Sequence, residues 1–195
     1  MNRCSRLFRQ PPRWMRARLG RLLPTQPPAD TLSWLFEKGS LTQRLRRGCV
    51  DPFRVVVLGQ GWIKPFAEEA RALGLRLGQR AIVREVSLQD GERPLVVARS
   101  VIPPRTLRGA DRRLASLGNQ PLGHILFADP RLRRQRLQLT RIAAADWLPN
   151  PGLGPMPEQP VWGRRSLYAL GPGHRLLVAE FFLPALFAPP MDTRR

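Results

Sequence analysis

The sequence predicts an α+β fold built around a single antiparallel β-sheet. Two observations lead to this fold class. First, two pairs of strand-like segments are each joined by a short turn, at Asp90-Gly91 and at Gly171-Pro172-Gly173, and a tight turn between two strands makes an antiparallel hairpin. Second, segments with the 3.6-residue period of helices precede these hairpins and lie between them, an order typical of α+β proteins.

The folded domain is predicted to span residues 29–188, between an N-terminal arm and a C-terminal tail of residues 189–195. The arm, residues 1–28, is rich in arginine, lacks acidic residues until its end and is interrupted by prolines. We therefore expect a flexible segment, or a short basic amphipathic helix over residues 14–23.

Two short helices are expected to open the domain. Asp30 or Thr31 can cap a helix that runs through Lys38, because a side-chain oxygen at this position accepts a hydrogen bond from a free backbone N–H. Ser40 can cap a second helix in the same way, with Leu41 on its apolar face.

From residue 51 onward the apolar pattern changes to the two-residue period of strands. Strands are predicted in "FRVVVLGQGW", in both halves of "LGQRAIVREVSLQDGERPLVVARSVIP", in "RRQRLQLTRIA", and in the final hairpin formed by "VWGRRSLYAL" and "HRLLVAEFFLP". A helix is predicted for "TLRGADRRLASLG", ending at Gly118, and a helical turn between Pro121 and Phe127. The Pro/Gly-rich stretch "AADWLPNPGLGPMPEQP" is predicted to be a long loop.

The composition limits the possible functions. The 195 residues are enough for one domain with a core, and the net charge of +19 comes almost entirely from arginine. Such a charge attracts polyanions, but the arginines are scattered and no nucleic-acid-binding motif is present, so no specific nucleic-acid partner is expected. Cys4 and Cys49 match no metal or redox spacing, and His124 and His174 are too few to indicate a metal site or a catalytic triad. With no membrane-spanning apolar run and no signal-peptide core, we expect a cytoplasmic protein.

Glu180 lies in the middle of the strand-like segment "RLLVAEFFLP", in which both faces are apolar. A carboxylate is almost never fully buried without a partner. Glu180 therefore lies either at a rim of the sheet, where it reaches solvent, or in a functional site, and the pattern alone leaves both alternatives open.

Arg84 and Arg99 raise the same question on the two strands of the first hairpin. A two-residue or four-residue turn places both side chains on one apolar face, whereas a three-residue loop with a bulge would separate them. Two neighbouring guanidinium groups need anions between them. These are either partners within the fold, such as Glu85, Glu180 or backbone carbonyls, or the carboxylates of a ligand, which match the guanidinium fork. The sharper hypothesis is an anionic, hydroxylated small molecule in a sheet-lined pocket, with Glu180 as hydroxyl acceptor or proton-transfer group.

Five segments, in order along the chain, resemble the chorismate pyruvate-lyase family of bacterial ubiquinone biosynthesis. They are "WLFEKGSLTQRL", "VREVSLQDGERPLVVARSVIP", "LGNQPLGHILF", "WGRRSLYAL" and "LLVAEFFLP", and they lie between Asp30 and Pro184. The resemblance implies a sheet of about six antiparallel strands with helices over one face and a ligand enclosed beneath helical flaps. It also implies a carbon–oxygen lyase that cleaves chorismate to 4-hydroxybenzoate and pyruvate with no metal or organic cofactor.

The resemblance further implies the site residues. The ligand arginine of the family's "LREI"-type strand corresponds to Arg84 of "VREV", and the glutamate of its "TELFLP"-type strand to Glu180 of "AEFFLP"; these two are the expected catalytic residues. A backbone contact in the "PLG" turn corresponds to Leu122, and a flap methionine to Leu41, which keeps the flap apolar. Arg99 lies in the matching "AR" segment and is expected in the pocket. On this basis Arg84 binds the ring carboxylate, Glu180 faces the opposite end, and Arg99 holds or offsets a second carboxylate.

Two other function classes are the alternatives. A non-catalytic ligand-binding domain, suggested by a related fold in transcription regulators, predicts an attached DNA-binding domain of about 60 residues or more, for which the 28 residues before the domain are too few. A basic nucleic-acid-binding protein predicts arginines clustered on one exposed face and a strongly salt-dependent affinity. Chorismate hydrolysis, or a different hydroxybenzoate isomer as product, is a further variant of the lyase hypothesis. The expected partner is chorismate; we also expect a monomer, with weak contact between the arm and anionic membranes.

Overall fold

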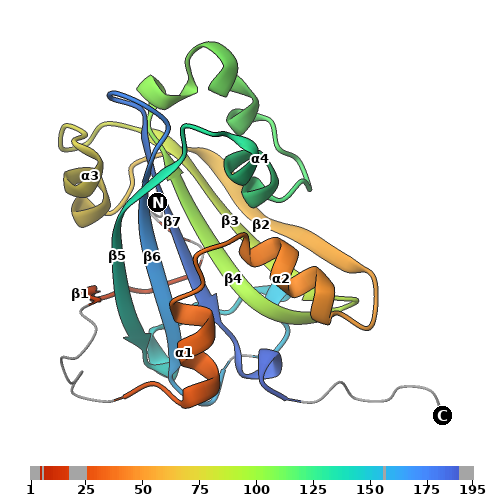
Figure 1. Cartoon of the computed structure of the whole chain (residues 1–195). Helices are drawn as coiled ribbons and strands as arrows, with labels where there is room; N and C mark the ends of the chain where they lie inside the picture. Colours follow the sequence, from red (N-terminus) through yellow and green to blue (C-terminus); the bar gives the residue numbers. More distant parts are fainter. Residues whose placement is uncertain (1–4, 6, 18–25, 156, 189–195) are drawn as a thin grey trace.

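The computed structural model describes the chain except for residues 1–4, 6, 18–25, 156 and 189–195. Its strands form one antiparallel sheet in the order β1-β5-β6-β7-β4-β3-β2 (Figure 1). This arrangement confirms the predicted α+β fold with a single antiparallel sheet. The strands are β1 (Met15–Arg16), β2 (Phe53–Ile63), β3 (Ala81–Asp90), β4 (Arg93–Ile102), β5 (Arg133–Ile142), β6 (Val161–Ala169) and β7 (Arg175–Phe182).

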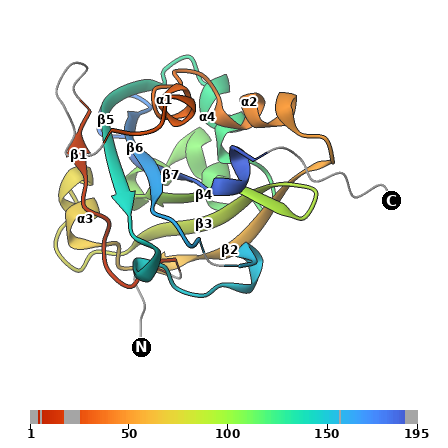
Figure 2. The same ribbon diagram turned by 90° about the horizontal axis from the view of Figure 1, so that it is seen from below.

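Helices cover both faces of the sheet. The first face carries α1 (Ala29–Leu35), α2 (Leu41–Gly48) and α4 (Leu122–Ala128), which Figure 2 shows on the same side of the strands. The opposite face carries α3 (Ala67–Leu73), a helix absent from the sequence-based prediction, which ends at Gly74 with a φ of 66°. The expected arrangement, with helices over one face, therefore holds for three of these helices and not for α3. Among the described residues, no helix is both long and apolar enough to cross a bilayer.

Apolar side chains fill the space on each side of the sheet, which explains why the central strands are apolar on both faces. On the first face, Leu35 of α1 and Leu45 of α2 belong to one core cluster with Val86 and Phe182 of the sheet. On the opposite face, Leu73 of α3 packs with apolar residues of β3, β4, β6 and β7. Side chains of both parities along β7 are therefore buried.

The helices at the start of the domain agree in part with the prediction. The side chain of Ser40 caps α2 and accepts a hydrogen bond from the backbone N–H of Gln43. The first helix begins at Ala29, directly after Pro28, and neither Asp30 nor Thr31 is its cap. Proline is well suited to this place because its missing N–H would have no partner in the first turn.

The segment "TLRGADRRLASLG" differs from the single α-helix that was predicted. It forms two 3₁₀ helices, η1 (Pro104–Leu107) and η2 (Gly109–Ala115), on either side of Arg108, whose backbone is extended. Gly109, the first residue of η2, has a low helix propensity and disfavours one continuous helix. Leu114 and Leu117 are nevertheless buried as expected, Leu107 is half-buried, and Gly118 ends the segment with a φ of 51°. The remaining 3₁₀ helices are η3 (Ala144–Asp146), η4 (Pro151–Leu153) and η5 (Pro184–Leu186).

The described part of the N-terminal segment packs against the domain. Met15 of β1 pairs with Leu139 of β5. Nearer the N-terminus, Phe8 bridges to Trp147, with ring centroids 5.0 Å apart, and its ring lies 4.9 Å from that of Phe181. This packing departs from the flexible arm that the sequence suggested. The alternative helix over residues 14–23 lies partly outside the described residues, and its described beginning is extended as β1.

This packing generates a stability prediction. Phe8 is 3% exposed, so Phe8→Ala should lower the free energy of unfolding by about 3 kcal/mol through lost burial and the cavity left behind. The neighbouring Arg9→Ala, an exposed side chain, is the matched control and should change it by less than about 0.5 kcal/mol. Urea denaturation of both variants measures the difference. Equal stability of Phe8→Ala and wild type would mean that the segment is flexible after all.

Candidate active site

A pocket lies between the first face of the sheet and the N-terminal ends of α2 and α4. Its floor comes from β3, β4 and β7, and its cover includes Leu41 of α2 and Leu122 of α4, both buried. The lining is mostly apolar. Its polar members are Thr42, Arg84, Ser100, Tyr168 and Glu180.

The strand register explains why Arg84 and Glu180 meet in this pocket. Arg84 of β3 pairs with Ser100 of β4, and Ser100 pairs with Val178 of β7. Glu180 is two residues further along β7, so its side chain points to the same face as Val178. The alternation of side chains thus places the two charged groups on neighbouring rows of one surface.

Arg84 is a buried cation without a carboxylate partner among the described residues. Its side chain is 2% exposed, and Nη2 donates hydrogen bonds to the backbone carbonyls of Gly118 at 2.9 Å and Gln120 at 3.1 Å. Its Nε has no partner in the described part of the chain. Burial lowers the pKa of Arg84 to about 10, which still leaves it a cation at neutral pH. A carboxylate from a ligand would supply the missing acceptor and the missing charge.

Glu180 is held by an arginine that the sequence analysis did not single out. Arg164 of β6 is 1% exposed, and its Nε donates to Oε2 of Glu180 at 2.5 Å. Burial lowers the pKa of Arg164, but the ion pair and hydrogen bond with Glu180, together with nearby Tyr168 and Glu37, raise it overall. The other oxygen, Oε1, has no hydrogen-bond partner among the described residues, so one carboxylate oxygen is available to a pocket ligand. This resolves the question of how β7 carries a carboxylate: Glu180 is both ion-paired and pocket-lining.

Arg99 was predicted to line the pocket, and this prediction is wrong. A register shift between Leu88 and Gln89 reverses the parity of β4 relative to β3, so Arg99 pairs with Glu85 and not with a residue on the face of Arg84. On the opposite face, Arg99 forms a bidentate ion pair with Glu69 of α3, both at 2.8 Å, and a further bond with Glu85 at 2.7 Å. These carboxylates raise the pKa of Arg99 against the effect of its burial. Arg99 therefore has a structural role, because its ion pair with Glu69 holds α3 to the sheet.

Of the five predicted site residues, the fold brings four together: Leu41, Arg84, Leu122 and Glu180. The residues that sequence reasoning missed include Arg164, Thr42, Ser100 and Tyr168. A signal for Arg164 was present, because "VWGRRSLYAL" also places a charged residue within an apolar strand and was predicted to pair with the strand of Glu180. Among the described residues, no group of three or more His, Cys, Asp or Glu side chains could hold a metal ion.

Comparisons with known proteins identify relatives of this chain. The sequence model of the family described as chorismate lyase matches residues 16–190. A protein of Methylococcus capsulatus, named probable chorismate pyruvate-lyase, is 54% identical over 158 residues, covering 81% of this chain and 97% of that protein. A protein of the same name from Azoarcus sp. is 46% identical over 165 residues, covering 82% of this chain and 86% of that protein.

Solved structures add evidence about the fold alone. A transcriptional regulator of the GntR family from Bacillus cereus is similar with a TM-score of 0.51 at 10% sequence identity, covering 71% of this chain and 96% of that one. At this identity the likeness supports a shared sheet architecture and says nothing about the ligand.

The contrast between Arg84 and Arg99 generates a second stability prediction. Arg84→Met removes a buried charge that has no carboxylate partner, and water can reach the exposed Gly118 and Gln120, so we expect the free energy of unfolding to change by less than about 1 kcal/mol. Arg99→Met leaves Glu69 and Glu85 buried without this partner and should lower it by about 3–5 kcal/mol. Urea denaturation of the two variants tests this. A similar loss in both would contradict the assignment of Arg84 as a group kept for ligand binding.

Proposed function

Because this chain belongs to the chorismate lyase family, we propose that it is a chorismate pyruvate-lyase, which converts chorismate to 4-hydroxybenzoate and pyruvate. The observation that carries the proposal is the buried Arg84, a guanidinium without a carboxylate partner among the described residues, facing a pocket whose other charged member is Glu180. The pocket therefore suits a ring with a carboxylate at one end and a hydroxyl at the other.

In the proposed complex, Arg84 binds the ring carboxylate through the guanidinium edge that the carbonyls of Gly118 and Gln120 leave free. The free oxygen of Glu180 accepts a hydrogen bond from the hydroxyl on ring carbon C4, while Arg164 binds the other oxygen. The buried leucines of α2 and α4 cover the ring and exclude water. The ring carboxylate and the hydroxyl on C4 then each have a partner of opposite hydrogen-bonding character.

The reaction breaks the ether bond between ring carbon C3 and the enolpyruvyl oxygen. Loss of the proton from C4 completes the elimination and makes the ring aromatic, while enolpyruvate takes up a proton and becomes pyruvate. Because aromatisation favours the elimination intrinsically, the protein mainly has to orient chorismate and stabilise developing charge. Glu180, at the hydroxyl end, is the group best placed to accept the departing proton. We propose a reaction without a metal or organic cofactor, because Arg84 and Glu180 supply the polar contacts that this elimination needs.

The wider biological setting is also a proposal. The product suits the first step of ubiquinone biosynthesis, in which a prenyl acceptor such as 4-hydroxybenzoate is needed. We propose a cytoplasmic monomer, with weak contact between anionic membranes and the basic N-terminal segment, residues 1–28. Sedimentation of the full chain with and without anionic vesicles measures both; a dimer, or no vesicle binding, would contradict the respective expectation.

The direct test is incubation of the purified chain with chorismate in the presence of EDTA, followed by chromatography. We expect 4-hydroxybenzoate and pyruvate in equal amounts. Binding of chorismate without turnover would contradict the lyase and favour a ligand-binding domain. Turnover that EDTA abolishes would contradict the cofactor-free mechanism alone.

Substitutions in the pocket test the residue roles. Arg84→Ala and Glu180→Ala should each lower kcat/KM by about 100-fold or more, because each removes a charged hydrogen bond to the substrate. Circular dichroism and the unfolding midpoint serve as the folding check. Near-normal turnover in either folded variant would reject the role of that residue.

A further inference from the structure

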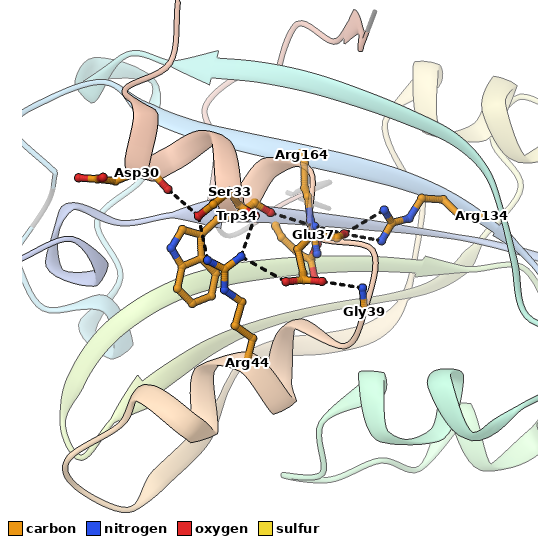
Figure 3. A network of polar contacts seen from close by, with 9 residues as sticks. Asp30, Ser33, Trp34, Glu37, Gly39, Arg44, Arg134 and Arg164 are labelled. Atoms are coloured by element: carbon orange, nitrogen blue, oxygen red, sulfur yellow. Dashed lines mark hydrogen bonds and ion pairs between the residues drawn. The ribbon is translucent and has the colours of Figure 1, made fainter. Parts of the chain in front are cut away.

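The connection between α1 and α2, residues 36–40, is held by three guanidinium groups (Figure 3). Arg164 donates from Nη1 to the carbonyl of Glu37 at 2.7 Å, and Arg134 donates from Nη1 and Nη2 to the same oxygen, both at 3.0 Å. Arg44 bonds the Glu37 carboxylate at 3.2 Å. Hydrogen bonds from three charged guanidinium groups thus fix this short connection in place.

Arg164 differs from the other two arginines because it also holds the pocket carboxylate. Its Nε binds Glu180 at 2.5 Å, while its Nη1 binds the carbonyl of Trp34 at 2.9 Å in addition to that of Glu37. The guanidinium is planar and rigid, so its two ends cannot move independently. One buried group therefore links Glu180 directly to the end of α1 and to the connection.

The connection leads straight into the wall of the pocket. It ends at Ser40, the cap of α2, and the next two residues, Leu41 and Thr42, line the pocket. Within the connection, the Glu37 carboxylate accepts the N–H of Gly39 at 2.8 Å, and this bond, together with Arg44, lowers the pKa of Glu37 despite partial burial. An outward movement of the connection would carry the first turn of α2 away from the ligand.

We propose that Arg164 is a positioning residue that couples the orientation of Glu180 to the closed position of the α1–α2 connection. While Arg164 binds both, closure holds Glu180 in its ligand-facing orientation, and the bond between Glu180 and Arg164 in turn stabilises closure. Thermodynamic linkage requires this effect to be equal in both directions. The inference deepens the proposed function and rests on it for the role of Glu180, but the coupling itself is measurable without any substrate.

Arg84 provides a matched comparison inside the same pocket. It is also a buried arginine of the pocket floor, and it also binds two carbonyls of a covering segment, but these belong to Gly118 and Gln120, just before α4. No bond joins Arg84 to the α1–α2 connection among the described residues. A change at Arg84 should therefore loosen the α4 side of the cover and not the α1–α2 side.

Hydrogen exchange of the ligand-free full chain, followed by mass spectrometry, tests the coupling. Glu180→Gln keeps the shape of the side chain but removes its charge, and among the described residues no hydrogen bond or ion pair joins Glu180 directly to the connection. We expect exchange in a peptide covering residues 36–44 to become about tenfold faster. Arg84→Lys should leave this peptide unchanged and accelerate exchange over residues 118–126 instead. Wild-type exchange over residues 36–44 in folded Glu180→Gln would overturn the proposal.

The double variant separates coupling from a merely structural role of Arg164. Arg164→Lys keeps the charge but cannot span both partners, so it should accelerate the same peptide, and adding Glu180→Gln should produce no further change. Independent, multiplying effects would overturn the proposal. If Arg164→Lys does not fold, the exchange of Glu180→Gln against Arg84→Lys still decides.

Kinetics distinguish a positioning role of Arg164 from a purely structural role in holding the connection. If the chain turns over chorismate, Arg164→Lys should lower kcat about tenfold with KM changed less than about twofold, because the substrate still binds Arg84 while Glu180 is misoriented. The reverse pattern would contradict a positioning role. Absence of turnover in wild type would reject the proposed function, whereas the exchange result would still stand.

Discussion

The structure depends on one constraint: a charged side chain that is buried between the sheet and its covering segments needs a group of opposite charge or a hydrogen-bond partner. On one face, Arg99 satisfies it with Glu69 and Glu85, and this ion-pair cluster fixes α3 to the sheet. On the other face, Arg164 satisfies it with Glu180 and with carbonyls at the end of α1. The partners of these two arginines therefore fix the positions of the segments that cover the sheet.

Arg84 meets this requirement only in part. Two backbone carbonyls bind one of its nitrogens, but no carboxylate of the described residues reaches it. Such a site is unfavourable for stability and suited to an anionic ligand, a combination that is common in binding sites. The pocket is thus polarised, with a cation that lacks a carboxylate partner among the described residues at one end and a carboxylate with one unbonded oxygen at the other. This arrangement is what the proposed substrate, with its ring carboxylate and its hydroxyl, would require.

Much of this architecture could be predicted from the sequence, because alternation and turn residues are local signals. They located strands β2 to β7, identified Arg84 and Glu180 as charges on apolar faces, and predicted Ser40 as a helix cap. The error at Arg99 came from a single extra residue in the hairpin, since a bulge reverses every side chain beyond it and the turn residues alone do not specify one. The role of Arg164 depended on which strands pair, and the packing of Phe8 on distant aromatic residues. Neither is a local property of the chain.

The measurement that tests the central claim most directly compares two ligands of the same shape. Calorimetric titration of the wild-type chain with 4-hydroxybenzoate and with the neutral 4-hydroxybenzamide reports the contribution of the carboxylate alone. If Arg84 binds the carboxylate of the ligand, the acid should bind about 100-fold more tightly than the amide, and Arg84→Met should remove that preference. Equal affinity of wild type for the two ligands would contradict the account.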